Sequence, residues 1–360
     1  MQKVLVWLSG WVDSAVSAYL LKKQWYDVVA GFMINYLAPD WEYCPTKDDI
    51  EVAKEVAEYL DIPFFTFDYR ETYSQKVLDY MYEWYKKWIT PNPDIMCNSE
   101  VKFRVFLDEA LEYWFDKIAM WHYAQIEKWD DWLYHLKKWI DKNKDQSYFL
   151  AWLNQEQLSK ALFPIWNLEK SEVRKIAEEA WLPNATRKDS QWICFVWKVD
   201  MSKFLEKKIK PKPGIVKDTS WKVLWEHKWV YYYTIGQRKG LDIWWQSEPI
   251  FVVKKDIEKN EIIVWNSNDL QLFDDKLYVE DFNFLSNSEF SFPLKAKAKI
   301  RYRQEDQDCI IYKQDISNSD IKSSFKYRVE FENSQRAIAV WQICAIYLDD
   351  ELVMSWVISW

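Results

Sequence analysis

Glycine is almost absent from this sequence, which has 5 glycines and 25 tryptophans in 360 residues. An average protein is about 7% glycine, so turns and phosphate-binding loops that require a residue without a side chain lack one here. Long apolar runs are also missing, and no window reaches the roughly 18 residues that a membrane-spanning helix needs. The amino terminus leads into a predicted strand instead of a signal peptide, so we expect a cytoplasmic protein without a membrane partner.

Metal-binding and disulfide patterns are also absent. The five cysteines, at positions 44, 97, 194, 309 and 344, form no CxxC pair, which argues against a disulfide framework and a zinc cluster. None of the three histidines has metal-ligand spacing, so we predict no protein metal site. The net charge of −8 argues against indiscriminate binding to nucleic acid. Residues 198–217, with seven lysines against two acidic residues, could still form either a solvated surface or a basic contact face.

Tryptophan stands where the local pattern favours glycine. Trp25 separates a predicted helix from a predicted strand, and Trp181 follows a helix and precedes Leu182-Pro183. Such junctions favour left-handed backbone, most often glycine. We therefore hypothesise that many of these tryptophans are glycine in the natural protein, as when a UGA codon that means glycine is read as tryptophan. The alternative is a chain that is truly rich in tryptophan.

The order of predicted elements indicates an α/β protein with two further β-rich parts. Strands 3–6, 26–33 and 64–67 alternate with helices 13–23 and 47–60, which predicts a doubly wound parallel sheet. Pro211, Pro213 and Gly214 mark a linker, after which short β-type runs follow, at 230–235, 250–254 and 261–264. The last part contains strand patterns alone, at 295–302, 309–312, 327–331 and 343–348. We expect a catalytic domain at 1–209, a small β-rich domain at 210–272 and a β-barrel at 273–360.

The most specific local motif follows the first predicted strand. It reads Ser9-Gly10-Trp11-Val12-Asp13-Ser14. With glycine at 11 it becomes SGGVDS, a loop whose backbone N–H groups and following helix would bind the pyrophosphate of a nucleotide. It is not a Walker A loop, because GK[ST] is missing. A serine-capped turn is the alternative, and an indole at 11 would fill the space that phosphates need.

This motif opens the PP-loop ATP pyrophosphatases, whose fold resembles that of the adenine nucleotide alpha hydrolases, and one family among them resembles the whole chain. The tRNA-specific 2-thiouridylases of bacteria share the segments 90–98 (TPNPDIMCN), 121–124, 144–150, 189–195 and 234–241, in order. Most departures from the family are tryptophan in place of glycine, at 7, 11, 88, 121, 192, 197 and 341. A distant relative would differ in many residue types, so this pattern supports miscoding over divergence.

The resemblance implies roles for particular residues. Cys194 would carry a persulfide, Asp94 would act as acid or base, and Cys97 would release the sulfur and form a disulfide with Cys194. Cys44, Cys309 and Cys344 lack such surroundings and are expected to be structural. The ATP site would comprise Trp7, Leu8, Ser9, Gly10, Trp11, Val12, Asp13, Ser14, Met33 and Trp121. The tRNA site would comprise Asn92, Pro93, Asp94, His122, Lys144, Asp145, Gln146, Arg301, Tyr302 and Gln342.

From residue type alone, several of these positions have ordinary readings. Met33 would be a core residue, and the polar positions would be solvated surface. The function that the resemblance implies is ATP-dependent 2-thiolation of the wobble uridine in tRNA. It would need Mg²⁺ bound with the nucleotide, and a relay protein or cysteine desulfurase as sulfur donor. Two alternatives stay open: another PP-loop ligase, which would not need Cys97 and Cys194, or an inactive tRNA-binding protein, if Trp11 and Trp121 are authentic.

Overall fold

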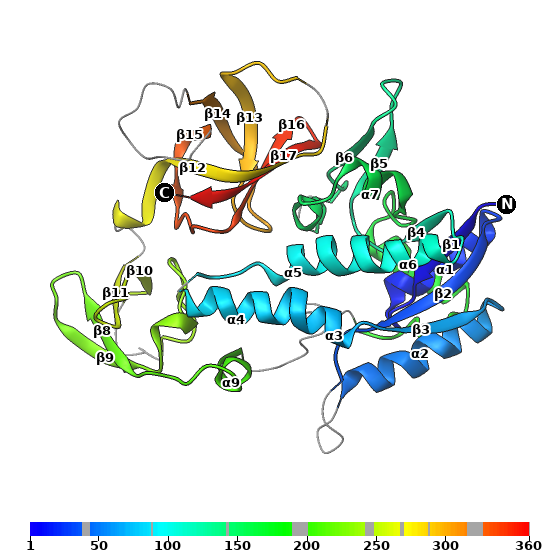
Figure 1. The fold of residues 1–360 in the computed structure, drawn as a ribbon, viewed down its shortest axis with the longest axis horizontal. Coiled ribbons are helices and arrows are strands. Elements are labelled where there is room, and N and C mark those ends of the chain that lie inside the picture. The colour runs from blue at the N-terminus through cyan, green and yellow to red at the C-terminus, as the bar shows by residue number, and fades with distance from the viewer. Residues whose placement is uncertain are drawn as a thin grey trace.

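The computed structural model describes residues 1–37, 44–87, 89–141, 144–188, 201–241, 248–266, 270–286, 289–314 and 327–359. Three parts are visible in Figure 1: an α/β domain that contains the amino terminus, a small β-rich domain, and a β-barrel that contains the carboxyl terminus. Two long helical segments cross between them.

Five parallel strands form the first sheet, in the order β3-β2-β1-β4-β7. They are β1 (Lys3–Trp7), β2 (Asp27–Ile34), β3 (Phe64–Asp68), β4 (Lys117–Ala119) and β7 (Ala161–Leu162). The strands are apolar along their length because helices cover both faces. Helices α1 (Val12–Lys23), α2 (Pro45–Tyr59) and α8 (Lys170–Glu179) pack on one face, and α6 (Phe106–Glu112) packs on the other. The predicted doubly wound sheet is confirmed, with its predicted elements within about two residues of their observed bounds.

Two long helical segments connect β3 to β4 and lie side by side (Figure 1). The first joins α3 (Arg70–Tyr73) to α4 (Asp79–Lys86), and the second joins α5 (Pro93–Met96) to α6. Each junction consists of wider π-helical turns, at Ser74–Leu78 and Cys97–Val105. Such turns are frequent at functional sites, and the second one begins at the predicted cysteine nucleophile.

A β-hairpin that the sequence patterns did not indicate extends the α/β domain towards the barrel. It consists of β5 (Gln125–Lys128) and β6 (Tyr134–Lys137), and is followed by α7 (Gln155–Lys160). Lys137 pairs with Glu351 of the barrel, so the hairpin continues the barrel sheet. The catalytic domain and the barrel therefore share backbone pairing as well as side-chain packing.

The small domain has a four-stranded sheet in the order β10-β11-β8-β9. Its elements are α9 (Met201–Glu206), β8 (Gly214–Asp218), β9 (Val223–His227), β10 (Ile250–Asp256) and β11 (Glu261–Asn266). The strand predicted at 230–235 is wrong, because Val230–Tyr232 form a 3₁₀ turn that packs Val230 and Tyr233 into the domain core. Lys208 and Lys217 form ion pairs with Asp79 and Glu261, so part of the lysine-rich segment serves internal contacts.

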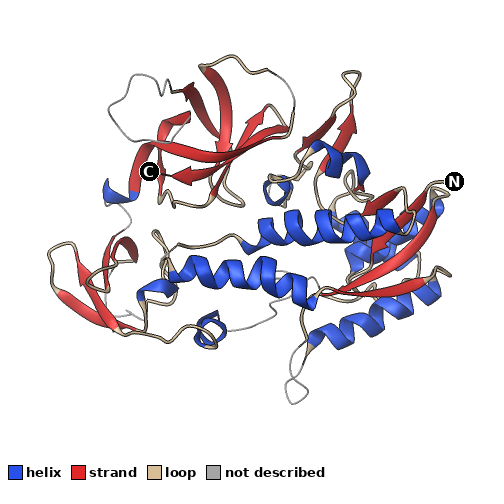
Figure 2. Cartoon of the chain, viewed as in Figure 1, coloured by secondary structure: helices blue, strands red, loops and turns tan. Residues whose placement is uncertain are grey.

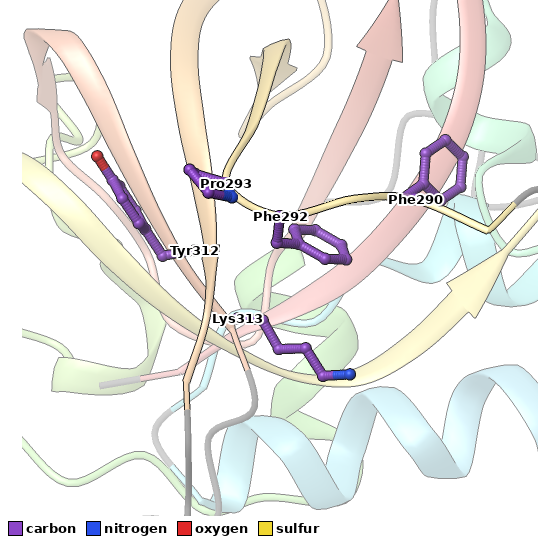
Figure 3. A pocket seen from close by; sticks show the side chains of 5 residues that line it. All are labelled: Phe290, Phe292, Pro293, Tyr312 and Lys313. Carbon is purple, nitrogen blue, oxygen red and sulfur yellow. The ribbon is translucent and has the colours of Figure 1, made fainter.

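Six antiparallel strands close the carboxyl-terminal barrel, and Figure 2 shows its strands beside the helical part. They are β12 (Phe273–Phe284), β13 (Leu294–Lys299), β14 (Gln307–Lys313), β15 (Tyr327–Arg336), β16 (Ile343–Leu348) and β17 (Glu351–Ser359). The predicted barrel is confirmed. Cys309 and Cys344 lie in its core, where burial raises the pKa of Cys309 to about 12 and raises that of Cys344 well above its usual value. A pocket on the barrel is lined by Phe290, Phe292, Pro293, Tyr312 and Lys313, and contains none of the predicted site residues (Figure 3).

Tryptophans occupy left-handed backbone in this fold. Of the twelve non-glycine residues with positive φ among those described, six are tryptophan, at 25, 114, 132, 181, 221 and 341. The first five expose 80, 87, 77, 82 and 60% of their surface. A side chain in this conformation costs about 1–2 kcal/mol, and an exposed indole gains little burial in return. The backbone thus supports the hypothesis that these positions are glycine in the natural protein.

Candidate nucleotide and tRNA site

The loop after β1 bends back on itself through hydrogen bonds between its two serines. Ser9 donates from both its backbone N–H and its hydroxyl to Ser14 Oγ, at 3.1 Å each. Ser14 donates to the carbonyl of Trp11 at 2.8 Å, and Gly10 has φ +80°. Leu8 and Val12 are buried beneath the loop. The loop is therefore fixed at the N-terminus of α1, where N–H groups lack partners within the helix and favour an anion.

Asp13 connects this loop to two other segments. The Tyr123 hydroxyl donates to Asp13 Oδ1 at 3.0 Å, and Lys170 donates to the same oxygen at 2.5 Å. Tyr123 belongs to the 121–124 motif, and Lys170 is the first residue of α8. Neither residue was predicted as part of the site, although Tyr123 lies inside a family motif. The pair holds the Asp13 carboxylate beside the anion-binding end of α1.

The carboxyl ends of β1 and β4 carry two tryptophans in contact. The Trp7 and Trp121 rings have centroids 4.0 Å apart, and Trp7 is 2% exposed. The buried Lys102 ammonium lies 4.8 Å from the Trp7 ring centroid. Met33, near the end of β2, is fully buried. Ligands of such sheets bind at this edge, so the two indoles occupy space where a nucleotide would lie, and glycine at both positions would open it.

The predicted catalytic motif forms the start of the second long helix. The Asn92 side chain accepts a hydrogen bond from Ile95 N at 3.3 Å and caps α5, and Pro93 occupies its first turn with Asp94. Cys97 follows, 2% exposed. The half-buried Asp94 is thus placed one turn before the thiol. Cys194 and the rest of the 189–195 motif lie outside the described residues, so the predicted pairing of the two cysteines stays a prediction.

His122 links the 121–124 motif to the cysteine helix. Its Nε2 donates to Asn98 Oδ1 at 3.1 Å, and Asn98 in turn donates to the carbonyl of Phe149 at 3.1 Å. Burial and the nearby Lys102 lower the His122 pKa well below its usual value. The imidazole is therefore neutral at neutral pH. Its buried Nδ1 has no hydrogen-bond partner among the described residues.

Of the predicted tRNA residues at 144–146, two serve internal contacts. Asp145 is 4% exposed and accepts hydrogen bonds from Trp139 N, Ser147 N and Ser147 Oγ. It also pairs with Lys299 of the barrel at 3.2 Å. Gln146 accepts a hydrogen bond from Tyr123 N at 3.0 Å. Asp145 and Gln146 thus hold this segment in place, and Lys144 beside them is half-buried.

The barrel residues predicted to contact tRNA border the cysteine helix. The Tyr302 ring lies 4.2 Å from that of Phe149, and its hydroxyl pKa is raised by burial first and by Asp145 and Asp94 to a smaller extent. Arg301 is exposed beside it and donates to the carbonyl of Arg336. The structure thus brings Arg301 and Tyr302 to the edge of the predicted catalytic motif.

Gln342 connects all three parts of the molecule. Its Nε2 donates to the carbonyl of Thr90 at 2.5 Å, and the Thr90 hydroxyl lies 2.8 Å from that of Thr234 in the small domain. The barrel, the TPNP segment and the small domain therefore meet at Thr90. In this structure Gln342 positions the catalytic segment.

Among the described residues no group of three or more histidine, cysteine, aspartate or glutamate side chains could hold a metal ion. Within the same part of the chain no helix is both long and apolar enough to cross a membrane.

Family models match almost the whole chain. Residues 2–198 match a tRNA methyl transferase HUP domain, 202–266 a tRNA methyl transferase PRC-barrel domain, and 274–358 an aminomethyltransferase β-barrel domain. The tRNA-specific 2-thiouridylase MnmA of Shouchella clausii is 41% identical over 359 residues, which are 99% of this chain and 96% of that protein. The namesake from Alkaliphilus oremlandii is 40% identical over 349 residues, covering 96% and 93%.

Among solved structures, the U34-tRNA thiolase NcsA of Methanococcus maripaludis is similar to 57% of this chain and 66% of that one, with 19% identity and a TM-score of 0.36. The similarity to the curated relatives extends over almost the full length of the chain. This chain belongs to the family of tRNA-specific 2-thiouridylases.

Proposed function

We propose that this protein uses ATP to replace the oxygen at position 2 of the wobble uridine of tRNA with sulfur. One observation carries the proposal. Tyr123 donates a hydrogen bond to Asp13 in the phosphate loop, and its chain neighbour His122 donates one to Asn98, the residue after Cys97. A phosphate loop and a thiol connected in this way allow one bound base to meet both.

The reaction divides into an activation step and a sulfur-transfer step. In the first, the uracil O2 attacks the α-phosphorus of ATP, pyrophosphate leaves with the electron pair, and the base becomes adenylated. In the second, the outer sulfur of a Cys194 persulfide attacks C2, and AMP leaves. The Cys97 thiolate then attacks Cys194 Sγ, which breaks the bond to the transferred sulfur and leaves a Cys97–Cys194 disulfide. A thiol reductant restores both cysteines before the next turnover.

The described side chains support defined roles in this reaction. Asp94 lies one turn before Cys97 and can take its proton. The neutral His122 can accept a hydrogen bond from the flipped-out base. Lys144, Arg301 and Tyr302 would contact the tRNA backbone and the neighbouring bases, because RNA is read in unstacked loops. Mg²⁺ would accompany the phosphates of ATP, and a relay protein or cysteine desulfurase would supply the sulfur.

The indoles at positions 7, 11 and 121 do not fit a bound nucleotide. The proposal therefore applies to the chain with glycine at these three positions, called the glycine form below. Retaining tryptophan at 11 and 121 would instead favour an inactive tRNA-binding protein. If the glycine form binds ATP and the chain with tryptophan at these positions does not, the result supports the enzyme over the inactive binding protein. Equal affinity in the two forms would show that the nucleotide lies elsewhere.

Sulfur loading tests the roles of the two cysteines. The glycine form is incubated with a cysteine desulfurase and cysteine, and its intact mass is measured. We expect an adduct of one sulfur, about 32 Da, on the Cys97→Ser variant and none on the Cys194→Ser variant. The reverse pattern would exchange the two roles. An adduct on both variants would place the sulfur on Cys44, Cys309 or Cys344 and contradict the mechanism.

A further inference from the structure

Arg187 lies against the phosphate loop from a segment outside the loop motif. Its Nη1 donates to the carbonyl of Gly10 at 3.0 Å, and its Nη2 pairs with Asp49. The guanidinium carbon lies 4.1 Å from the ring centroid of Trp11. The guanidinium is thus stacked over the side chain that fills the loop, and only 25% of the Arg187 side chain is exposed.

The backbone that carries Arg187 is fixed beside the loop. Arg187 N donates to the carbonyl of Asn184 at 3.0 Å, and Arg174 donates to the carbonyl of Arg187 at 2.9 Å. Asn184 also donates to the carbonyl of Gly10 at 2.9 Å. Hydrogen bonds therefore fix the loop and the 184–187 turn to each other, so the guanidinium is preorganised before a ligand binds.

Asp49 gives Arg187 a counter-charge when no ligand is present. The Asp49 side chain is 6% exposed, and burial raises the pKa of its carboxyl while Arg187 opposes this effect. An arginine has five N–H donors, all in the plane of the guanidinium. The contacts to Gly10 and Asp49 use one N–H of Nη1 and one of Nη2, so the described contacts leave three donors for a ligand. The face of the guanidinium is covered by the Trp11 indole alone among its described ring contacts.

Replacing Trp11 by glycine would uncover that face and open a space between the guanidinium and the N-terminus of α1. An anion in this space would meet bare backbone N–H groups on one side and a fixed cation on the other. We propose that Arg187 binds the pyrophosphate part of ATP and neutralises the charge that develops on it as it leaves. This inference rests on the proposed function, and adds a residue from outside the SGGVDS motif to the ATP site.

A pyrophosphate group, which has several adjacent anionic oxygens, fits this position better than a ligand with one negatively charged atom. Arginine binds phosphate oxygens through two parallel N–H donors, and it keeps its charge at every physiological pH. Pyrophosphate and the β- and γ-phosphates of ATP offer adjacent oxygens at that spacing. Adenosine offers none, so the arginine should distinguish ligands by their phosphates.

The test separates ligand binding from the structural ion pair. Removing Arg187 alone would leave Asp49 buried and unpaired, which destabilises folding. We therefore compare three versions of the glycine form: unchanged, Asp49→Asn, and the double variant Arg187→Met with Asp49→Asn. An Arg187→Lys variant keeps the positive charge but lacks the two parallel N–H donors of arginine. Lys175→Met, which changes an exposed residue of α8, is the matched control.

Calorimetry with ATP, inorganic pyrophosphate and adenosine gives the readout. Asp49→Asn and Lys175→Met should retain pyrophosphate and ATP affinity. The double variant should lose about 10- to 100-fold in affinity for both, because a charge-assisted hydrogen bond is worth about that factor. The affinity of the double variant for adenosine should not change. The affinity of Arg187→Lys for ATP and pyrophosphate should lie between those of the unchanged protein and the double variant.

Three outcomes would overturn the inference in different ways. Equal ATP and pyrophosphate affinity in the double variant and in Asp49→Asn would exclude Arg187 as a ligand and leave the proposed function intact. A parallel loss of adenosine affinity would show that Arg187 only holds the loop. Failure of the unchanged glycine form to bind ATP would contradict both the inference and the proposed function.

Discussion

Replacing three exposed tryptophans by glycine should stabilise this protein. Trp25, Trp114 and Trp181 follow the ends of α1, α6 and α8 with φ of 63, 63 and 53°. Each is the left-handed residue of a Schellman motif, in which the next N–H bonds back to a carbonyl of the last helical turn. These bonds are Tyr26 N to Leu21 O at 3.2 Å, Phe115 N to Ala110 O at 3.0 Å and Leu182 N to Ala177 O at 3.0 Å.

The expected gain follows from two opposing contributions. Removing the side chain relieves about 1–2 kcal/mol of left-handed strain at each position. Glycine loses more backbone entropy on folding, which returns about 0.5–1 kcal/mol. The indoles are 80, 87 and 82% exposed, so little apolar burial is lost. The net gain is about 0.5–1 kcal/mol per site, or roughly 1.5–3 kcal/mol for three independent sites.

Thermal denaturation followed by far-ultraviolet circular dichroism measures this effect without depending on tryptophan fluorescence. One kcal/mol raises the midpoint by about 2–4 °C in a domain of this size. The triple variant should therefore melt about 4–10 °C higher. Trp356→Gly is the contrasting control, because Trp356 is fully buried in β17 and its removal should cost about 3–5 kcal/mol. A triple variant that melts lower would refute the reasoning that these positions are glycine.

Further predictions concern tRNA binding, pH and catalysis. Lys144→Ala and Arg301→Ala should each lower the slope of log affinity against log salt by about 0.7–0.9, measured by titration at several salt concentrations, and a salt-independent affinity would exclude this binding face. The lowered pKa keeps His122 neutral in the fold, so its stabilising effect is fully present above the unfolded pKa of about 6.5 and is lost as pH falls below that value towards the lower folded pKa. Urea denaturation at pH 7 and pH 5 should therefore show a smaller acid loss in His122→Gln than in the unchanged chain, and an equal loss would contradict the assignment. Asp94→Asn should slow thiolation in a single-turnover assay and leave sulfur loading on Cys194 intact, whereas a loading defect would argue against a proton-transfer role.

The sequence predicted the elements that have strong local signals. The apolar strands at 3–7 and 27–34 lie close to their predicted bounds, because buried parallel strands have a clear pattern. The helix at 12–23 also lies close to its predicted bounds. The hairpin at 125–137 could not be found in the same way. Its strands are four residues each, and they are stabilised by pairing with a barrel strand more than 200 positions away. The turn at 230–232 has β-type residues, yet tertiary packing of Val230 determines its form.

The candidate site was predictable as a set of motifs, but less so as a set of roles. The structure connects His122 to Asn98, beside Cys97, and Tyr123 to Asp13 of the phosphate loop, whereas the predicted roles of these residues stay predictions. Arg187 and Lys170 could not be assigned from sequence, because neither lies inside one of the motifs. Asp145 and Gln342 illustrate a second difficulty. Their residue types suggest a nucleic-acid surface in the sequence, yet in the structure both make contacts between domains.

Thiolation of tRNA by the glycine form tests the central claim most directly. The protein is incubated with ATP, a tRNA that has a wobble uridine, cysteine and a cysteine desulfurase, and the digested tRNA is analysed by mass spectrometry. The account predicts one 2-thiouridine for each AMP released, and none without ATP or with Cys194→Ser. AMP release without 2-thiouridine, or 2-thiouridine formed without ATP, would contradict it.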